Sequence, residues 1–572
     1  MKKIIQILAL FTVLALPYSC DTLEPEKDNI YDINDVKSVV TYVEGFLMNA
    51  YRNLPTAHTN FTLSYACDDA VNNDPTSNIK TTIAGGWTSN ANPFSQWRTT
   101  YESILYINTF LENMDGEDWY FASQKVTELF DKKLRGEAYA LRAWNYFHLL
   151  QAHAGKGANG QMLGVPIIDK VIPADNPESY ELPRSSFNDL VKFILDDCDK
   201  AIGLLPDRWV DTDDADANVA IGIRNTNRIN GLVARFIKAK TLLYAASPAF
   251  SDGTYTYQMA AEAAAELMDK NNGLSDLSEN DLEFWSTTDV TSANNSNPEV
   301  IWYSALQSNV NSWEVDNYAP SLYGEGLTNP TQDLVNAFPM LDGTPVGSDK
   351  LNSDNPYSER DPRLDMYILY NGAQFKQGGN TVTVNTTNGS QDALGSTDVY
   401  STKTGYYLKK FMNVKNVDLN PSVDSKGMRY YTYVRYTDVL LMFAEAANEA
   451  VGPDGDIGGY TAQQVINAIR DRAGITSNDY VNSLGKSGMT NLIRNERRIE
   501  LCFEKQRFWD LRRWKMISEM NSPVHGVQVS ADGSSYTYLQ VEGRNYADYQ
   551  IYGPIPYSET LKYNIVQNEG WE

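Results

Sequence analysis

The sequence predicts a mainly α-helical protein in which a tetratricopeptide-like helical scaffold carries a loop-rich insertion containing short strands. Three observations support this fold class. Apolar residues recur at three- and four-residue steps along most of the chain, several helical segments mix small with aromatic residues, and one internal stretch is rich in Asn, Ser, Thr and Gly. Small residues let neighbouring helices approach closely while aromatic rings fill the gaps, as in tetratricopeptide helix pairs.

The N-terminal segment is typical of an export signal followed by a tether. Two lysines precede an apolar run that is shorter than the roughly 20 residues of a bilayer span. Cys20 follows the small residue Ser19, as at the acylation site of bacterial lipoproteins. We therefore expect a signal peptide over 1–19 and a lipidated, acidic tether over 20–33. An ordinary secretory signal is the alternative, because Pro17 stands where a lipobox usually has Leu.

Residues 34–572 are expected to form a single domain, with the helical scaffold at about 34–270 and 430–525. The amphipathic patterns predict helices at about 36–54, 96–114, 122–153, 186–204, 227–247, 257–270, 436–451, 461–473 and 488–519. Each Ala-rich segment looks like half of a helix-pair repeat. The segments are spaced irregularly, so the sequence does not predict a regular repeat array.

The loop-rich insertion is expected at about 272–430, followed by a C-terminal return over 526–572. Short apolar runs predict strands at 300–306, 381–385 and 406–411. Because loops on a rigid frame commonly carry recognition residues, we expect this insertion to face the ligand.

Composition excludes several function classes. The chain has 42% hydrophobic and 21% charged residues, as globular proteins do, and a net charge of −25 that would repel a phosphate backbone, so nucleic acid is not an expected partner. No second apolar run approaches the length of a membrane span. Apart from Cys20 there are three cysteines, Cys67, Cys198 and Cys502, which allow at most one disulfide. Cys198 and Cys502 lie in helical apolar patterns and are expected to be small buried residues.

A search for catalytic and metal-binding motifs is mostly negative. His148 and His153 are five residues apart and lack a zinc-binding context, and the chain has no nucleophile elbow, P-loop or dinucleotide fingerprint. The segment PDGDIGG at 453–459 lacks the later Glu of a calcium loop, so we interpret it as an inter-helix loop. We therefore predict no catalytic residue, no metal and no cofactor.

A dense group of charges lies at 491–515. Glu496, Glu500 and Glu504 recur four residues apart among several arginines, and on one helix they would form a charged ladder beside an apolar face. Such a cluster could mark a site, but ion pairs and Arg–Trp contacts that fix helix packing are the favoured interpretation.

The same segment carries a family resemblance. ERRIELCFEKQRFWDLRRWK (496–515) and YGPIPYSETLKYNIVQNEGW (552–571) closely resemble the C-terminal signature of the SusD/RagB family of bacterial surface glycan-binding lipoproteins. Further blocks resemble the family in its order, namely RGEAYALRAWNYFHLL (135–150), GVPIID (164–169), ARFIKAKTLLYAASP (234–248), DPRL (361–364), YVRYTDVLLMFAEAANE (433–449) and INAIRDRAG (466–474). The resemblance covers nearly the whole chain.

This resemblance implies a non-enzymatic protein that binds oligosaccharides at the outer membrane, anchored by acyl chains such as palmitate at Cys20 and facing the cell exterior. Its expected partner is a SusC-like TonB-dependent β-barrel, to which it would deliver ligand as a lid, with no membrane contact beyond the lipid. A peptide-binding lid of the RagB type and a surface glycoside hydrolase are the alternatives. Which glycan is bound does not follow from the sequence.

Two loops contain the residue types that sugars need, namely flat rings with Asp, Asn and Arg nearby. In the first, at 64–90, the expected ligand-binding residues are Asp68, Asp69, Asn72 and Trp87. Trp87 follows two glycines in a polar loop, and the alternative for it is an aromatic residue at the rim with no role. Trp97, by its helical spacing, is expected to pack between helices.

The second loop, at 309–326, contributes Trp313, Tyr318 and Tyr323 as expected ligand-binding residues, with Asp316 beside them. Packing onto the barrel is the alternative for these aromatics. The remaining ligand-binding candidates are Arg363 and Tyr407. Trp302 lies in a continuous apolar strand and is expected in the core.

Overall fold

The computed structural model describes residues 39–571 except 59, 115–122, 174, 176, 276, 278–282, 286–297, 348–349 and 378–379. The predicted signal peptide, Cys20 and the tether lie outside the described residues, as does the predicted helix start at 36–38.

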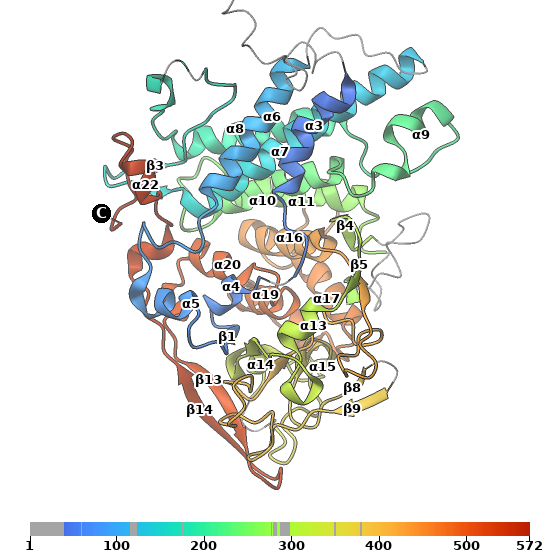
Figure 1. Ribbon diagram of the computed structural model, residues 1–572, viewed down its shortest axis with the longest axis vertical. Helices are drawn as coiled ribbons and strands as arrows, with labels where there is room; N and C mark the ends of the chain where they lie inside the picture. The colour runs from blue at the N-terminus through green and yellow to red at the C-terminus, as the bar shows by residue number, and fades with distance from the viewer. Residues whose placement is uncertain are drawn as a thin grey trace, which may run out of the picture.

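A continuous stack of helices forms the scaffold, which occupies the upper and middle parts of Figure 1. Its members are α3 (Val40–Arg52), α6 (Trp97–Asn113), α7 (Gln124–His153), α8 (Phe187–Leu204), α10 (Gly231–Ala246), α11 (Tyr257–Lys270), α16 (Tyr436–Val451), α17 (Ala462–Arg472) and α19 (Lys486–Glu500). Each of the first seven packs against the next in this order, and α16 also contacts α17 and α19. Because α11 packs directly on α16, the predicted insertion leaves and rejoins the stack at one place.

Local sequence explains why these helices begin where they do. Side chains of Ser123, Ser186, Asn230 and Thr256 accept a backbone N–H in the first turn of the helix that follows, and Thr461 forms a capping box with Gln464. Within the stack, α10 is buried on all sides except at one lysine, as expected for a helix at the centre of the core.

One predicted helix is wrong. The sequence pattern over 488–519 suggested a single helix, but α19 ends at Glu500 and α20 spans Arg507–Arg513. Between them, Phe503 and Lys505 have left-handed φ angles of 64° and 67°, which end the helix although no Gly or Pro stands there.

Short antiparallel strand pairs connect segments of the rest of the chain, most of which lies in the lower part of Figure 1. The pairs are β1 (Ala70–Asn72) with β6 (Thr328–Pro330), β2 (Gly155–Lys156) with β3 (Met162–Leu163), β4 (Val300–Tyr303) with β12 (Thr432–Arg435), β5 (Gln307–Val310) with β11 (Gly427–Arg429), β7 (Ile368–Leu369) with β10 (Tyr407–Leu408), β8 (Gln374–Gln377) with β9 (Asn380–Thr383), and β13 (Val524–Val529) with β14 (Tyr536–Glu542). Each sheet in the described residues has two strands, so the core depends on the helices.

Short helices lie between the longer helices and the strands along the chain. They are α4 (Thr62–Tyr65), α5 (Asn78–Thr81), α9 (Ala215–Ile221), α13 (Ser312–Asn317), α14 (Gln332–Ala337), α15 (Pro362–Tyr367), α18 (Asp479–Asn482), α21 (Ile517–Met520) and α22 (Tyr557–Thr560). The β13–β14 hairpin, which the sequence patterns did not predict, reaches from the scaffold down one edge of the molecule (Figure 1).

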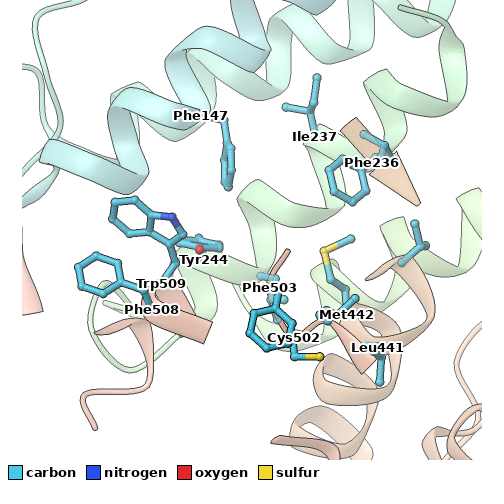
Figure 2. Packing of buried hydrophobic residues seen from close by; sticks show 14 of the residues in the cluster. Phe147, Phe236, Ile237, Tyr244, Leu441, Met442, Cys502, Phe503, Phe508 and Trp509 are labelled. Carbon is cyan, nitrogen blue, oxygen red and sulfur yellow. The ribbon is translucent and has the colours of Figure 1, made fainter. Parts of the chain in front are cut away.

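Aromatic side chains pack between the scaffold helices and the C-terminal segment. Figure 2 shows Phe147 of α7 and Phe236 of α10 facing Phe503 and Trp509, which come from the C-terminal segment. Trp302 is fully buried, and Trp97 of α6 lies edge-on to His153, so both expectations are confirmed. Cys67, Cys198 and Cys502 are free and buried. The predicted fold class is confirmed.

Side chains of α19 form buried ion pairs with residues of neighbouring segments. We call this group the α19 ion network (Asp361, Arg363, Arg435, Arg472, Glu496 and Glu500). Glu500 accepts hydrogen bonds from Arg363 at 2.7 Å and from Arg472 at 2.8 Å, and it also binds Arg435. Burial alone would raise the pKa of Glu500, but the three guanidinium groups outweigh it and hold the pKa well below its usual range. The charges at 491–515 therefore fix packing, as predicted.

Candidate functional site

The two loops predicted to bind ligand meet in the structure. Strand β1 of the first loop pairs with β6, which directly follows the second loop. The side-chain amide of Asn73 donates to the backbone oxygens of Glu325 at 2.8 Å and Tyr400 at 3.2 Å, so it ties a third segment to the other two. We call this surface the loop junction (residues 72–76, 316–326 and 398–403).

Backbone contacts hold the loop junction in one arrangement. Gly326 has a left-handed φ of 51°, and a Cβ there would lie 2.5 Å from the backbone oxygen of Tyr400, so only glycine fits. Ser321 donates both its backbone N–H, at 2.9 Å, and its hydroxyl to the carboxylate of Asp392. Tyr323 itself adopts a left-handed φ of 66° after the short 3-10 turn Pro320–Leu322. This conformation costs free energy, and the neighbouring bonds keep it in place.

Two tyrosine rings are the exposed aromatic groups of the loop junction. Tyr323 is 55% exposed and Tyr400 is 43% exposed. Asn72, which is half-buried, accepts the backbone N–H of Asp74 at 2.8 Å, and Asp74 in turn accepts from the backbone and hydroxyl of Thr76. Flat rings beside fixed carboxylate and amide groups offer the two kinds of contact that a sugar makes, stacking on its C–H faces and hydrogen bonds to its hydroxyls.

Two half-buried carboxylates, those of Asp316 and Glu325, belong to the same loop junction. The backbone N–H of Glu325 donates to Val315 at 2.7 Å, and that of Leu327 donates to Asp316 at 2.8 Å, which brings the two acidic residues together. Burial raises the pKa of Asp316 to about 6, and the negative charges of Glu325 and Glu314 add to the shift. Shifted acid groups of this kind are frequent at functional sites. Near neutral pH, Asp316 can therefore change between accepting and donating a hydrogen bond.

Trp87 is not on this surface, and the expectation that it offers a stacking face is wrong. It is 2% exposed, with Phe94 at 4.9 Å and Trp571 at 4.8 Å in edge-to-face contact. Its ring N–H donates to Asn92 at 3.0 Å, and the guanidinium of Arg512 lies 5.5 Å from the ring centre. These neighbours leave no room for a ligand.

Trp313, Tyr318 and Tyr407 are buried as well, which corrects their expected role in stacking. Trp313 lies in α13 and is covered by Arg429, 4.9 Å from its ring centre. Tyr318 is fully buried, as is Tyr407, whose hydroxyl accepts from the backbone of Thr402 at 2.9 Å and donates to Asp392 at 3.0 Å. The polar loop composition misled the prediction because these rings pack inside the loop region itself, as Tyr318 does against Phe375 at 6.0 Å.

Arg363, Asp68 and Asp69 are occupied by ion pairs, so their assignment as ligand contacts is also wrong. Arg363 is fully buried in the α19 ion network. Arg507 binds both oxygens of Asp68, at 2.9 and 3.0 Å, and Arg498 binds Asp69 at 3.0 Å. Burial alone would raise the pKa of Asp68, but Arg498 and Arg507 hold it well below its usual range. These two aspartates and Cys67 lie close enough to share a metal ion, yet the arginines already neutralise the carboxylates.

Of the expected contact residues, Asn72 and Tyr323 remain available to a ligand, and the sequence interpretation missed Tyr400 and Glu325. Tyr400 lies in the run GSTDVYSTKTG, which has the same Ser/Thr/Gly setting that singled out Tyr323. That signal was present in the sequence. The pairing of Glu325 with Asp316 was not, because it depends on how the two ends of the second loop fold back on each other.

A stack of paired helices that presents loops with exposed rings and carboxylates defines a helical-scaffold binding protein. The chain belongs to the SusD/RagB family. A model of the SusD family matches residues 287–571, and a model described as starch-binding and associating with the outer membrane matches residues 21–218. Within the described residues, no helix has the length and apolar character needed to cross a bilayer.

Individual relatives agree with this assignment. A SusD-like protein of Formosa agariphila is 27% identical over 248 residues, which is 41% of this chain and 43% of the relative, so the match spans less than half of that protein. Among solved structures, a SusD-like protein of Bacteroides fragilis is 24% identical with a TM-score of 0.74, covering 95% of this chain and 99% of that one. A SusD-like carbohydrate binding protein of the same species is 22% identical with a TM-score of 0.70, covering 92% and 99%. These structures share the fold.

Proposed function

We propose that this protein binds oligosaccharides through the loop junction at the outer-membrane surface. The observation that carries the proposal is that two exposed rings, Tyr323 and Tyr400, share one loop junction with the half-buried polar residues Asp316, Glu325 and Asn72. Family membership and the carbohydrate-binding solved relative support the ligand class. Binding by stacking and hydrogen bonding breaks no covalent bond, so the protein is not an enzyme in this proposal.

The proposal also includes a route for the ligand. Acylation at Cys20 would anchor the protein to the membrane with the loops facing outward, and a SusC-like TonB-dependent barrel would receive the oligosaccharide beneath a lid formed by this chain. The family model described as associating with the outer membrane supports this location. Mass spectrometry of the N-terminal peptide from native membranes tests the anchor, and co-purification of a barrel with the tagged full chain tests the partner.

A binding screen of the full chain against purified neutral polysaccharides and their oligosaccharides tests the ligand. For a glycan that binds, Tyr323→Ala is expected to weaken affinity by about 1–3 kcal/mol, the scale of stacking on an exposed ring, with an unchanged melting temperature. Tyr538→Ala is the matched control, because Tyr538 is 48% exposed on strand β14. Equal weakening by both substitutions would remove the loop junction from the proposal, and competition by oligopeptides would favour a peptide-binding lid instead.

One observation favours a second function. Asp316, with a raised pKa, and Glu325 resemble the acid and carboxylate pair of a glycoside hydrolase. Release of new reducing ends from a bound glycan, abolished by Asp316→Asn, would establish hydrolysis. Stable binding without release supports the binding protein.

A further inference from the structure

A separate pocket lies between the scaffold and the C-terminal segment. It has a volume of about 230 Å³ and is bounded by α3, α6, α7 and α10 on one side and by residues 431–435 and 503–509 on the other. Figure 2 shows four of its wall residues, Phe147, Phe236, Phe503 and Trp509. Its volume is below the roughly 300–1,000 Å³ of pockets for drug-sized ligands, so it suits one small ring. We call it the interlayer pocket.

Partly exposed aromatic rings line this pocket. Trp144, Tyr431 and Tyr433 are half-buried although the residues around them are packed. Each ring is held by neighbours, since Trp144 lies edge-on to Trp302 at 5.2 Å and Tyr433 lies 4.3 Å from Trp302. Rings fixed in this way offer stacking faces without losing further side-chain freedom on binding.

The polar groups of the pocket are partly unsatisfied. The hydroxyl of Thr432 is buried and has no hydrogen-bond partner among the described residues. Buried polar atoms without a partner are uncommon and call for an explanation. The strained turn at 501–506, with left-handed Phe503 and Lys505, places consecutive residues in the pocket wall. Such backbone strain is concentrated at functional sites.

The cationic side chains that line the pocket differ in their partners. Lys240 pairs with Asp438 at 2.8 Å, and Arg435 pairs with Glu504 at 2.6 Å. Lys505 has no carboxylate partner within the described part of the chain, and its ammonium lies 5.0 Å above the ring of Tyr431.

The two pocket histidines are uncharged at neutral pH. Burial lowers the pKa of His148 to about 3, with Lys240 and Lys505 adding to the shift, and burial with Lys505 lowers the pKa of His58 well below its usual value. Among the cationic side chains that line the pocket, Lys505 is therefore the one without a carboxylate partner in the described part of the chain.

We propose that the interlayer pocket binds a single sugar ring that carries a carboxylate, of the uronic acid class. The ring stacks between Trp144 and the Tyr431–Tyr433 pair, its hydroxyls bond to polar groups such as Thr432, and its carboxylate pairs with Lys505. Pro55, Gln96 and Thr99 line the pocket and are exposed, so the ring enters between α3 and α6. The ligand class rests on the proposed carbohydrate function, but this site is distinct from the loop junction.

Calorimetric or NMR titration of the full chain with glucuronate, glucose and acetate tests the proposal. Glucuronate is expected to bind at least tenfold more tightly than either comparator, because only it has both the ring and the charge. Lys505→Gln is expected to remove that preference, with unchanged glucose binding. Lys562→Gln, at an exposed lysine of the C-terminal segment, is the matched control.

The outcomes separate this inference from the proposed function. Equal affinity for glucuronate and glucose, equal binding of acetate, or an unaltered preference in Lys505→Gln would each overturn the interlayer site. Tyr323→Ala is expected to weaken oligosaccharide binding but to leave glucuronate binding unchanged, and equal weakening of both would also overturn the interlayer site. If Lys505→Gln does not fold, the wild-type comparison of glucuronate with glucose and acetate still decides. Oligosaccharide binding without any glucuronate binding would leave the loop junction standing and the interlayer proposal refuted.

Discussion

The α19 ion network and the loop junction both contain several carboxylates. Those of the network have guanidinium partners, whereas two of those at the loop junction lie close to each other. In the network each buried carboxylate faces guanidinium groups, as Glu500 does with three arginines. At the loop junction, Asp316 and Glu325 lie beside each other without an ion pair in the described residues. Paired charges fix the scaffold, whereas the adjacent like charges at the junction would suit the proposed ligand contact. The comparison predicts that substitutions in the first region change stability and those in the second change binding.

The largest effect is expected at the network. Glu500→Gln leaves three buried arginines without their shared carboxylate and should lower the free energy of unfolding by about 3–5 kcal/mol. Denaturant unfolding measures the change. Glu102→Gln, at an exposed position of α6, is the control and should have little effect. A loss below about 1 kcal/mol at Glu500 would show that the network does not fix the packing.

Trp87→Ala should come close to this effect, although the sequence placed Trp87 in the binding loop. Removing a buried indole leaves a cavity and typically costs about 3–5 kcal/mol. A thermal melt measures the loss. Because Trp571 packs against Trp87 at 4.8 Å, the double substitution should cost less than the sum of the single ones. Weaker glycan binding with an unchanged melting temperature would instead restore Trp87 to the site.

Tyr400→Ala tests whether a second ring of the loop junction contributes to glycan binding. Its ring is less exposed than that of Tyr323, so the expected loss of glycan affinity is about 1 kcal/mol, the lower end of the stacking range, with no change in melting temperature. Calorimetry with the same oligosaccharide measures it. An unchanged affinity would show that Tyr323 alone provides the stacking surface for the glycan.

The smallest effect is expected from the titration of Asp316. Its folded-state pKa, about 6, lies above its ordinary value of 3.8, so the folded state is favoured while the carboxyl is protonated and loses that advantage as pH rises from about 4 to 6. Solvent screening limits the change to under about 1 kcal/mol. Asp316→Asn should remove it from the pH dependence of unfolding. An NMR titration midpoint near 4 would contradict the raised pKa.

The scaffold was predictable from sequence because helix periodicity and N-caps are local. The helix at 436–451, for example, has the bounds that its apolar pattern indicated. The break after Glu500 was not predictable, since Phe503 and Lys505 adopt left-handed conformations without a Gly or Pro to signal them. The meeting of the two recognition loops followed from neither pattern, although both loops had been singled out.

Exposure of individual rings was the least predictable property. Trp87 and Tyr323 both lie in polar loops, but only the first finds a buried partner, Trp571, at the other end of the sequence. The composition of a segment predicts that it forms a loop, but it does not predict which of its side chains are buried. Residues whose partners are hundreds of positions away therefore need the fold before they can be assigned.

The contact between Trp87 and Trp571 also bears on how the chain matures. A ribosome adds residue 571 long after residue 87, so the indole at 87 lacks this partner until the ring at 571 has been made. Closure of that cluster is a late, non-local step, which slows folding relative to the local helices. Removing Trp571 would consequently loosen a loop that is almost five hundred positions away in the sequence.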